Sequence, residues 1–333
     1  MDQPSAELLT KLLKEVSRSF YLTLRVLPDA VRPQISLAYL LARTSDTLAD
    51  TDILPAANRL KGLAAYAARV AGERARPVEF PEFITNQGVP AEAELLRRSE
   101  EAVGLLETFE EMDRHLIRKV LKVIISGQTL DLQRFAGASE RRVVALETET
   151  ELDDYTYRVA GVVGEFWTEL CRDHLFPRAR IDGAAMIEKG IRFGKGLQLV
   201  NILRDIPKDL RQGRCYIPRD LLRQADLQPA DLLEPGTEYR FRPVHRHLLN
   251  RAENFLGDAW AYTNAIPRGQ LRVRLACAWP VLIGLETVKA LRSGNVLDPA
   301  QRIKVSRDRV KFLMARSIVA YPFPGFWNRQ VQV

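Results

Sequence analysis

The sequence predicts an all-α fold, and three observations support this prediction. Apolar residues recur at steps of three and four residues along most of the chain, which is the spacing of a helix face. Runs that alternate apolar and polar residues between Asn-Gly or Asp-Gly turns are absent from the sequence. Segments rich in proline and glycine separate the periodic stretches, as turns between helices do.

Each periodic segment is expected to form a helix that buries one apolar face. In chain order the segments are 7–16, 30–46, 56–71, 91–109, 114–134, 152–171, 183–205, 243–263, 270–292 and 306–320. The helix breakers between them are Pro28 with Asp29, Pro55, the stretch from Pro77 to Pro90, 137–139, 229–236 and 267–269.

Two of these segments depart from the usual amphipathic pattern. The segment 30–46 is apolar on most sides and yet ends in charged residues. The segment 183–205 contains Gly190, Gly194 and Gly196. A helical glycine costs about 1 kcal/mol relative to alanine, so we expect another helix or a bulky ligand to approach these positions closely.

The 333 residues are near the upper limit for one hydrophobic core, and no repeat, low-complexity tract or long linker divides them. We therefore expect a single-domain helical bundle over residues 1–333, with an aromatic tail at 320–333. The three cysteines are widely separated and lack metal-ligand spacing. This usage favours a reducing compartment and no disulfide framework.

The first 14 residues do not have the charged-then-apolar order of a signal peptide. The longest uncharged apolar run, 275–285, has 11 residues, whereas a membrane-spanning helix needs about 20. We expect a cytoplasmic protein, with peripheral membrane contact as an option. The net charge of +7 fits nucleic acid, an anionic lipid surface or a polyanionic small substrate, and a solvated basic surface is the simplest alternative.

Two aspartate pairs have the same spacing in distant parts of the chain. Asp46 and Asp50 are four residues apart, and so are Asp205 and Asp209, with Asn201 one turn before them. On a helix, residues at this spacing lie on one face with Cβ atoms about 5–6 Å apart. Each pair therefore offers oxygen atoms on one side of its helix, and oxygen atoms suit a hard cation.

The like charges in these pairs need a counter-charge, because two unit charges 4 Å apart repel by roughly 4 kcal/mol at an effective dielectric near 20. Mg²⁺ would supply it, since this ion prefers a few carboxylates together with water and substrate phosphates. We expect two metal-binding walls with a diphosphate between them. A single pair at this spacing is most often a solvated helix face. The neighbouring basic residues favour the diphosphate site: Arg43, Arg204, Lys208, Arg211 and Arg214.

Four blocks, in order, resemble the squalene/phytoene synthase family. The first is Ser17-Arg18-Ser19-Phe20 with Leu27-Pro28, and the second runs from Tyr39 through Arg43 and Asp46 to Asp50. The third begins at Tyr155 and ends in Val-Ala-Gly-Val-Val-Gly at Gly164. The fourth runs from Gly196 through Asp205 and Asp209 to Gly213-Arg214-Cys-Tyr216-Ile-Pro218. The resemblance covers most of the chain.

The resemblance implies an isoprenoid-synthase bundle with a central cavity, in which Mg²⁺-dependent chemistry joins two prenyl diphosphates head to head. The metal ligands that it implies are Asp46, Asp50, Asn201, Asp205 and Asp209, and the aspartates are also candidate catalytic residues. The implied substrate-binding residues are Arg18, Ser19, Phe20, Tyr39, Arg43, Gln198, Arg204 and Arg214. Tyr155 matches a catalytic tyrosine of the family that is assigned to proton transfer or cation stabilisation.

Further aromatic residues, Phe166 and Trp167 among them, are candidates for stabilising a carbocation, and plain core packing is the alternative for each. The glycines of the third and fourth blocks would let helix backbones approach a long prenyl chain, and close helix–helix packing is equally consistent with them. These are Gly161, Gly164, Gly194 and Gly196.

Two positions depart from the family pattern. Pro207 lies inside the second aspartate motif, where it removes a backbone donor and frees the carbonyl of Leu203. We therefore expect the helix to kink or end nearby, which weakens the case for Asp209 more than for Asp205. Ala49 stands where squalene synthases often have another acid, and two carboxylates still suffice for the role.

The family contains enzymes with and without a reductive step. The segment from Ile303 through Lys304 to Arg307 resembles the basic segment of squalene synthases that meets NADPH, with a solvated helix start as the alternative. The run 275–280, Leu-Ala-Cys-Ala-Trp-Pro, resembles a second squalene synthase segment. We expect squalene synthesis from two farnesyl diphosphates through presqualene diphosphate, with NADPH as reductant. Phytoene or dehydrosqualene synthase, and an enzyme that stops at presqualene diphosphate or forms hydroxysqualene, are the alternatives.

A non-catalytic basic helical protein that binds nucleic acid or a membrane surface is the alternative from another class. Scattered basic residues without a recognition helix argue against nucleic acid. The aromatic tail, 321–327, suits either a bilayer interface or a segment folded back on the bundle. The sequence leaves open the oligomeric state and the choice between C15 and C20 substrates.

Overall fold

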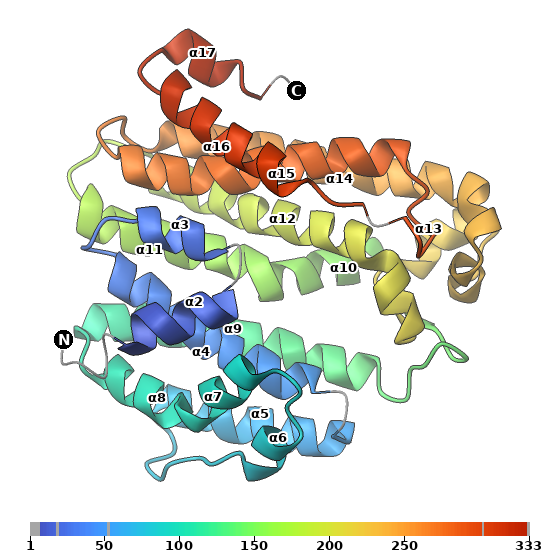
Figure 1. The fold of residues 1–333 in the computed structure, drawn as a ribbon, viewed down its shortest axis with the longest axis horizontal. Coiled ribbons are helices and arrows are strands. Elements are labelled where there is room, and N and C mark those ends of the chain that lie inside the picture. The colour runs from blue at the N-terminus through green and yellow to red at the C-terminus, as the bar shows by residue number, and fades with distance from the viewer. Residues whose placement is uncertain (1–6, 18–19, 52–53, 302, 332–333) are drawn as a thin grey trace. The chain divides into compact units, whose positions relative to one another are not determined.

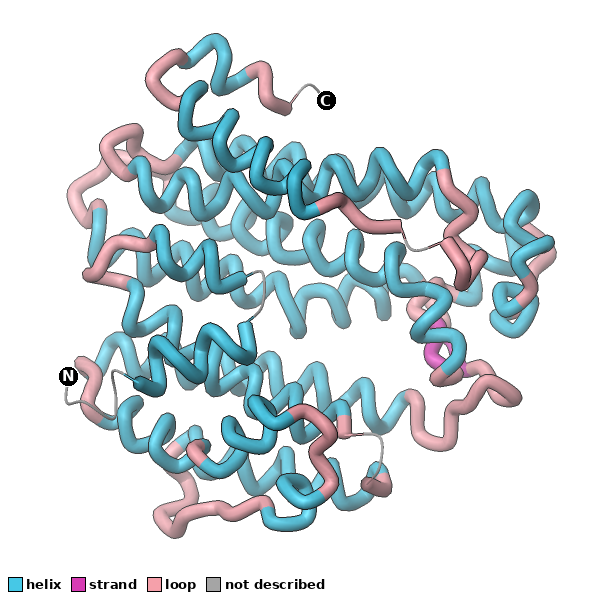
Figure 2. Tube along the Cα trace, viewed as in Figure 1, coloured by secondary structure: helices cyan, strands magenta, loops and turns pink. Residues whose placement is uncertain are grey.

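A computed structural model describes residues 7–17, 20–51, 54–301 and 303–331 (Figure 1). Its regular elements are helices, apart from two strands of two residues each, so the all-α prediction is confirmed (Figure 2). Two compact units divide the chain: Met1–Ala136 with Phe166–Arg178, and Gly137–Glu165 with Ala179–Val333. That the whole chain acts as one domain stays a prediction.

The first unit contains two long helices, α4 (Arg32–Asp50) and α9 (Glu111–Arg134), which pack against each other and against α5. Helices α7 and α8 also contact α4. The other elements are η1 (Leu8–Leu12, a π-helical turn), α2 (Leu13–Ser17), α3 (Phe20–Val26), α5 (Ala56–Ala71), α6 (Pro81–Thr85), α7 (Pro90–Arg97) and α8 (Ser99–Glu107).

Helix α4 is buried along most of its length although its second half is rich in hydroxyl residues. Leu37, Leu40, Leu41 and Leu48 form its apolar face and are fully buried. The buried hydroxyl groups donate to backbone carbonyls three or four residues earlier, and Thr44 bonds to Leu40 in this way at 3.0 Å. These bonds satisfy the polar groups inside the helix, so that α4 can carry its two aspartates from a buried position.

The second unit is built on α12 (Gly183–Arg211), α14 (Glu238–Ala265) and α15 (Leu271–Ser293), each of which packs against the other two. Asp182 starts α12 by accepting a hydrogen bond from the Ala185 amide at 3.1 Å. The remaining elements are β1 (Val144–Ala145), α10 (Glu149–Thr156), η2 (Tyr157–Gly161, a π-helical turn), the start of α11 (Val162–Leu175), β2 (Arg214–Cys215), α13 (Arg219–Gln224), η3 (Pro229–Leu233), η4 (Pro235–Thr237), α16 (Arg307–Ala320) and α17 (Pro324–Asn328).

The glycines of the second unit allow close helix–helix packing. A Cβ atom on Gly164 would lie 1.8 Å from the carbonyl oxygen of Gly190, and one on Gly194 would lie 2.1 Å from that of Ala160. A Cβ atom on Gly196 would lie 2.9 Å from the Cβ atom of Phe255 on α14. Of the two interpretations left open by the sequence, helix packing therefore accounts for the space beside these glycines.

Several predicted boundaries were wrong. The segment 91–109 is two helices, because the chain leaves helical geometry at Arg98. Helix α12 continues through Pro207 to Arg211 instead of stopping at 205, so both aspartates belong to one helix, and a kink at the proline stays a prediction. The short helices α3, α6, α13 and α17 were not predicted, since pieces of five to seven residues carry too little periodicity.

Two further expectations concern the cysteines and the membrane. Cys171, Cys215 and Cys277 are buried, and none of the three is disulfide-bonded in this structure. Among the described helices, none has an apolar stretch long enough to cross a bilayer.

Candidate active site

The first aspartate motif lies on the second half of α4. Asp46 accepts a hydrogen bond from the side-chain amide of Gln128 on α9, and Arg43 lies 3.8 Å from its carboxylate. Asp50, at the end of the helix, is exposed. The Asp46 side chain keeps 46% of its surface accessible, so both carboxylates can reach a ligand from outside the helix.

Burial, followed by the neighbouring Asp50 carboxylate, raises the pKa of Asp46 to about 7. Arg43 and the hydrogen bond from Gln128 oppose this rise but do not overcome it. Because the side chain is still partly accessible, burial acts on it less fully than in a sealed core. A carboxyl group that resists ionisation beside a second one is electrostatically suited to a cation.

Arg43 is the predicted phosphate ligand of this motif, and in the structure it also pairs with Glu92 of α7. This acid was not among the predicted site residues, because nothing in its sequence context marks it. Glu92 fixes the position of the Arg43 guanidinium, whereas the ion pair between Arg43 and Asp46 is long, at 3.8 Å. Tyr39, one turn before Arg43 on α4, is half-buried.

The second motif is a polar stripe along α12. Gln198, Asn201, Asp205 and Asp209 recur at steps of three and four residues, and Leu199, Ile202, Leu203, Ile206 and Leu210 form the buried face. Asn201 is exposed, whereas Gln198, Asp205 and Asp209 are half-buried. The oxygen atoms predicted to bind metal thus lie on the accessible side of one continuous helix.

Arg204 pairs with its neighbour Asp205 through two parallel hydrogen bonds of 2.8 and 2.7 Å. Each carboxylate oxygen of Asp205 therefore accepts one hydrogen bond from the Arg204 guanidinium. Each carboxylate oxygen has a further lone pair, so the pairing is compatible with metal binding. In this structure Arg204 orients a predicted metal ligand, in addition to its predicted role toward the diphosphate.

The segment that follows α12 carries Tyr216, which contacts the catalytic tyrosine candidate Tyr155. Gly213 adopts a φ of +75°, and a Cβ atom there would lie 2.2 Å from the Ser139 amide nitrogen. The turn leads into β2, which pairs in parallel with β1. Tyr216 then stacks on Tyr155 with ring centroids 4.8 Å apart.

Asp209, Arg214 and Tyr216 line one small hollow of about 10 Å³, which is room for about one water molecule. The structure thus places the last aspartate, the predicted phosphate-binding Arg214 and the Tyr155–Tyr216 stack in one neighbourhood of the second unit. Tyr216 was not a predicted site residue, although it belongs to the fourth block of the family resemblance.

An ion-pair network fixes the helix that carries Tyr155. Asp153 of α10 accepts hydrogen bonds of 2.6 Å from both Lys195 of α12 and Arg251 of α14. Arg251 also bonds to Glu149 at 3.2 Å. Two residues after Tyr155, at Tyr157, α10 gives way to the π-helical turn η2, a feature that is frequent at functional sites.

The two motifs supply a donor set that fits Mg²⁺. Both consist of carboxylate oxygens, with one amide oxygen from Asn201, and all of these side chains are at least partly accessible. Among the described residues, no three His, Cys, Asp or Glu side chains converge as a ready-made metal cage. Mg²⁺ prefers a few carboxylates completed by water and phosphate oxygens, and the donors of the two motifs are of this kind. That the two motifs bind one diphosphate stays a prediction.

The remaining site predictions have mixed outcomes. Arg18 and Ser19 lie outside the described residues, and of Phe20 only the backbone, at the start of α3, is described. Lys304 and Arg307 are exposed, between α15 and the first residue of α16. Phe166 is buried in the core, as its alternative interpretation proposed. The run 275–280 is buried along α15, apart from its half-buried Pro280, so its role in this structure is packing.

The aromatic tail divides between two environments. Trp327 is only 3% exposed and stacks on Trp260 of α14, at 5.0 Å between ring centroids. The tail is thus folded back onto the second unit, which was one of its two predicted states. Phe323 and Phe326, however, stay 56% and 64% exposed.

With this fold and these two motifs, a comparison with known families gives a direct match: the squalene/phytoene synthase family model matches residues 13–309. The chain therefore belongs to the squalene/phytoene synthase family. Members of this family are head-to-head prenyltransferases that bind prenyl diphosphates with a divalent metal, so the chain is an enzyme.

Curated relatives are similar at a moderate level. The chain is 29% identical over 305 residues to a bifunctional lycopene cyclase/phytoene synthase of Phaeosphaeria nodorum, covering 89% of this chain and 48% of the relative. It is 27% identical to a 15-cis-phytoene synthase of Synechocystis, with 86% of this chain and 74% of the relative covered. The chain thus spans about half the length of the fungal relative and most of the cyanobacterial one.

Among solved structures, the squalene synthase TcSQS in complex with a ligand superposes with a TM-score of 0.78. The match covers 95% of this chain and 86% of the other, at 20% sequence identity. At this identity the likeness concerns the fold.

Proposed function

We propose that this enzyme joins two farnesyl diphosphates head to head to give presqualene diphosphate, and that its aspartate motifs hold Mg²⁺ against the departing diphosphate. The observation that carries the proposal is that α4 and α12 each present accessible carboxylates four residues apart, with an arginine one turn or less away. Bound Mg²⁺ would neutralise the leaving diphosphate, which lowers the barrier to ionisation of the allylic substrate.

The chain's own residues would divide the work around that step. Arg43 and Arg214 would bind diphosphate oxygens through their guanidinium forks. Arg204 would hold Asp205 in place, as its two hydrogen bonds already do. The stacked Tyr155 and Tyr216 would present an aromatic surface to the carbocation, and the Tyr155 hydroxyl would be placed to move a proton.

For the later step we propose reduction by NADPH to squalene. Lys304 and Arg307 support it, because both are exposed and neither pairs with a carboxylate of a described residue. Two such cations close together in sequence suit the phosphates of a nicotinamide nucleotide.

A second candidate is a synthase that forms phytoene or dehydrosqualene without a reductant. The names of the curated relatives favour it, since the fungal and the cyanobacterial relative described above are both named as phytoene synthases, the fungal one with a lycopene cyclase as well. It requires the same first condensation, so the two candidates differ in the second step and in the length of the substrate.

A product assay tests both steps. The purified protein would be incubated with farnesyl or geranylgeranyl diphosphate and Mg²⁺, with and without NADPH, and the hydrocarbon identified by mass spectrometry. Squalene formed only with NADPH, and lost in a Lys304→Gln/Arg307→Gln variant that still makes presqualene diphosphate, supports the first candidate. A C40 product, or a C30 hydrocarbon formed without reductant, supports the second.

The shared condensation has its own test. Asp46→Asn and Asp205→Asn should each lower diphosphate release by about a hundredfold or more, because each removes a charge that the metal needs at the transition state. Circular dichroism would check that the fold is kept, and Glu79→Gln, an exposed acid in the loop before α6, serves as the control for a lost surface charge. Full turnover in both aspartate variants would contradict the proposal.

A further inference from the structure

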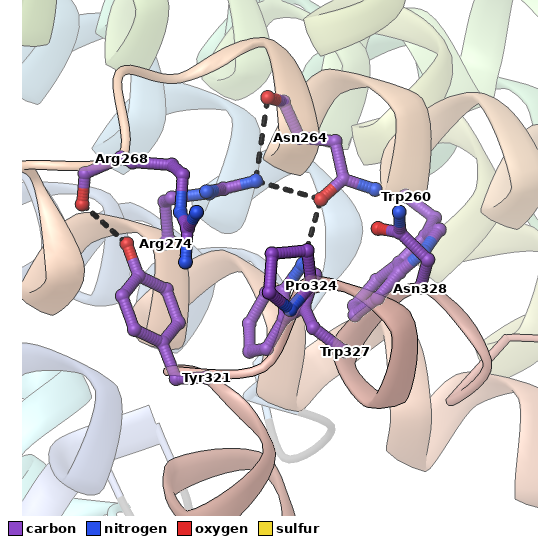
Figure 3. Close-up of a pocket in the computed structure, with 8 residues that line it drawn as sticks. All are labelled: Trp260, Asn264, Arg268, Arg274, Tyr321, Pro324, Trp327 and Asn328. Carbon is purple, nitrogen blue, oxygen red and sulfur yellow. Dashed lines mark hydrogen bonds between the residues drawn. The ribbon is translucent and has the colours of Figure 1, made fainter.

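A pocket that shares no lining residue with either aspartate motif lies in the second unit, where α14 ends, α15 begins and α17 folds back (Figure 3). Its volume is about 440 Å³, which is within the usual range for small-ligand sites. Trp260 and Asn264 come from α14, Arg268 from the following loop and Arg274 from α15, while Tyr321 and Trp327 belong to the C-terminal segment.

Arg274 is 5% exposed, and the groups around it hold its guanidinium in a fixed plane. Its Nε donates to the carbonyl of Thr263 at 3.0 Å, and its Nη2 donates to the carbonyl and side-chain oxygens of Asn264 at 3.3 and 2.7 Å. The rings of Tyr321 and Trp327 lie 5.6 and 5.5 Å from its central carbon. Arg274 thus caps the carboxyl end of α14 and is already oriented before any ligand arrives.

The pocket carries positive charge that the described residues do not neutralise. Arg268 is exposed at its edge, and its guanidinium donates a long hydrogen bond of 3.4 Å to the carbonyl of Pro322. No acidic side chain lines the pocket, and among the described residues no carboxylate pairs with either arginine. The carboxyl end of α14 contributes about half a negative charge, so two arginines leave roughly 1.5 positive charges.

The polar groups of the pocket are mainly donors. Asn264 accepts hydrogen bonds from Arg274 and from the Trp327 indole through the same side-chain oxygen, at 2.7 Å each. This fixes the amide so that its NH₂ group is the part left for a ligand. Guanidinium forks and an amide donor, without a carboxylate, match a ligand that only accepts hydrogen bonds.

We propose that this pocket binds a phosphate group, with Arg268 and Arg274 as its charged ligands. Two sources of phosphate fit this chemistry: a soluble phosphate or diphosphate, and the headgroup of an anionic lipid. The exposed Phe323 and Phe326 flank the pocket residue Pro324 and favour the lipid source, since apolar side chains beside a phosphate site suit the boundary between headgroups and acyl chains. The proposal does not depend on the function proposed for the aspartate motifs.

Isothermal titration with inorganic pyrophosphate, in EDTA and at constant ionic strength, tests the soluble source while the metal-dependent site is silent. Flotation with vesicles of phosphatidylglycerol, against phosphatidylcholine alone, tests the lipid source. The test variant is Arg268→Gln, which removes an exposed charge without touching the core. Arg272→Gln is the matched control, because Arg272 is also exposed on the same stretch but does not line the pocket. A Phe323→Ser/Phe326→Ser variant separates the two sources.

We expect Arg268→Gln to weaken binding of its ligand by about tenfold or more, and Arg272→Gln to change it little. Pyrophosphate binding with this pattern supports the pocket with a soluble ligand. Phosphatidylglycerol-dependent flotation that is lost in both Arg268→Gln and the Phe323/Phe326 variant supports it with a lipid ligand. Equal effects of the two arginine variants, or no binding of either probe, would overturn the proposal.

Discussion

At the residue scale, the surroundings of Asp46 set its charge state. Its carboxyl group has a pKa of about 7 because burial and Asp50 both disfavour its charged form. An unfolded aspartate ionises near pH 3.9. The folded chain therefore holds a proton that the unfolded chain releases, and stability falls as the pH rises from about 4 to 7. This destabilisation is the expected property of a residue placed to receive a cation.

We predict that Asp46→Asn raises the melting temperature by about 2 °C at pH 8 without divalent cations, a shift discounted for the partial accessibility of the side chain. At pH 4 the difference should vanish, because Asp46 is then protonated in the folded chain. Mg²⁺ with pyrophosphate should stabilise the wild type more than the variant. Differential scanning calorimetry measures all three, and a wild type more stable than the variant at pH 8 without metal would refute the assignment.

His245 is a buried titratable residue outside the proposed site. It is 3% exposed and stacks on Phe241, and no described residue forms a hydrogen bond with its Nε2. Burial lowers its pKa to about 4, with nearby Arg292 and Arg242 acting in the same direction and Glu238 against it. In the unfolded chain the histidine takes up a proton near pH 6.5, whereas in the folded chain it stays neutral at that pH.

We predict that His245 contributes an acid-sensitive part of the stability. As the pH falls from 7.5 to 5, the unfolded chain gains a proton at this residue and the folded chain does not, which removes about 2 kcal/mol from the free energy of unfolding. His245→Leu should abolish this part, whereas His115→Leu at an exposed position should not. Urea unfolding at the two pH values measures the difference. Parallel losses in wild type and His245→Leu would count against it.

At the scale of elements, the contact between α12 and the α10–η2–α11 segment determines where Tyr155 lies. Gly164 and Gly194 meet backbone carbonyls rather than side chains, so no rotamer change can make room for a methyl group at either position. The ion pairs of Asp153 with Lys195 and Arg251 hold the same helices. Close packing at the glycines therefore fixes the distance between these elements, and the ion pairs fix their alignment.

We predict that Gly164→Ala and Gly194→Ala each destabilise the protein by about 1–3 kcal/mol or more, because the helices must separate. Gly104→Ala on α8 is the matched control, since nothing lies within 4 Å of the added Cβ. It should stabilise by about 0.5–1 kcal/mol through helix propensity and the unfolded state. Thermal unfolding gives the three values. A tolerated alanine at Gly164 would show that this contact is looser than the structure has it.

The elements that the sequence predicted well are the long ones. Helix α5 was predicted at its observed ends, 56–71, and α12 at its start, because a proline or a capping aspartate marks those positions. The sequence predicts too early an end for α12 because a proline such as Pro207 locally breaks a helix. In the structure the buried side chains of Leu203, Ile206 and Leu210 keep the helix intact. Tertiary burial outweighed the loss of one backbone hydrogen bond.

At the scale of the whole molecule, the proposed function requires the motif of the first unit and that of the second to serve one diphosphate. If they do, their contributions to pyrophosphate binding are coupled. We predict that Asp46→Asn and Asp205→Asn each abolish most Mg²⁺-dependent binding of pyrophosphate, and that the double variant is hardly worse than either. Coupled residues behave in this way, whereas independent sites give additive losses. Titration calorimetry in the presence of Mg²⁺ measures the binding free energies of the wild type, the two single variants and the double variant. Additive losses would show that the two motifs do not bind the same pyrophosphate.

The sequence by itself determined the helical fold, the family and the residues of both motifs, because periodicity, helix spacing and ordered blocks are local properties of the chain. Only the tertiary structure decided what those residues contact: Gln128 on Asp46, Glu92 on Arg43 and Tyr216 on Tyr155. It alone also revealed the pocket of Arg268 and Arg274. Such contacts join positions tens of residues apart, and their energies depend on burial and distance, which no local pattern encodes.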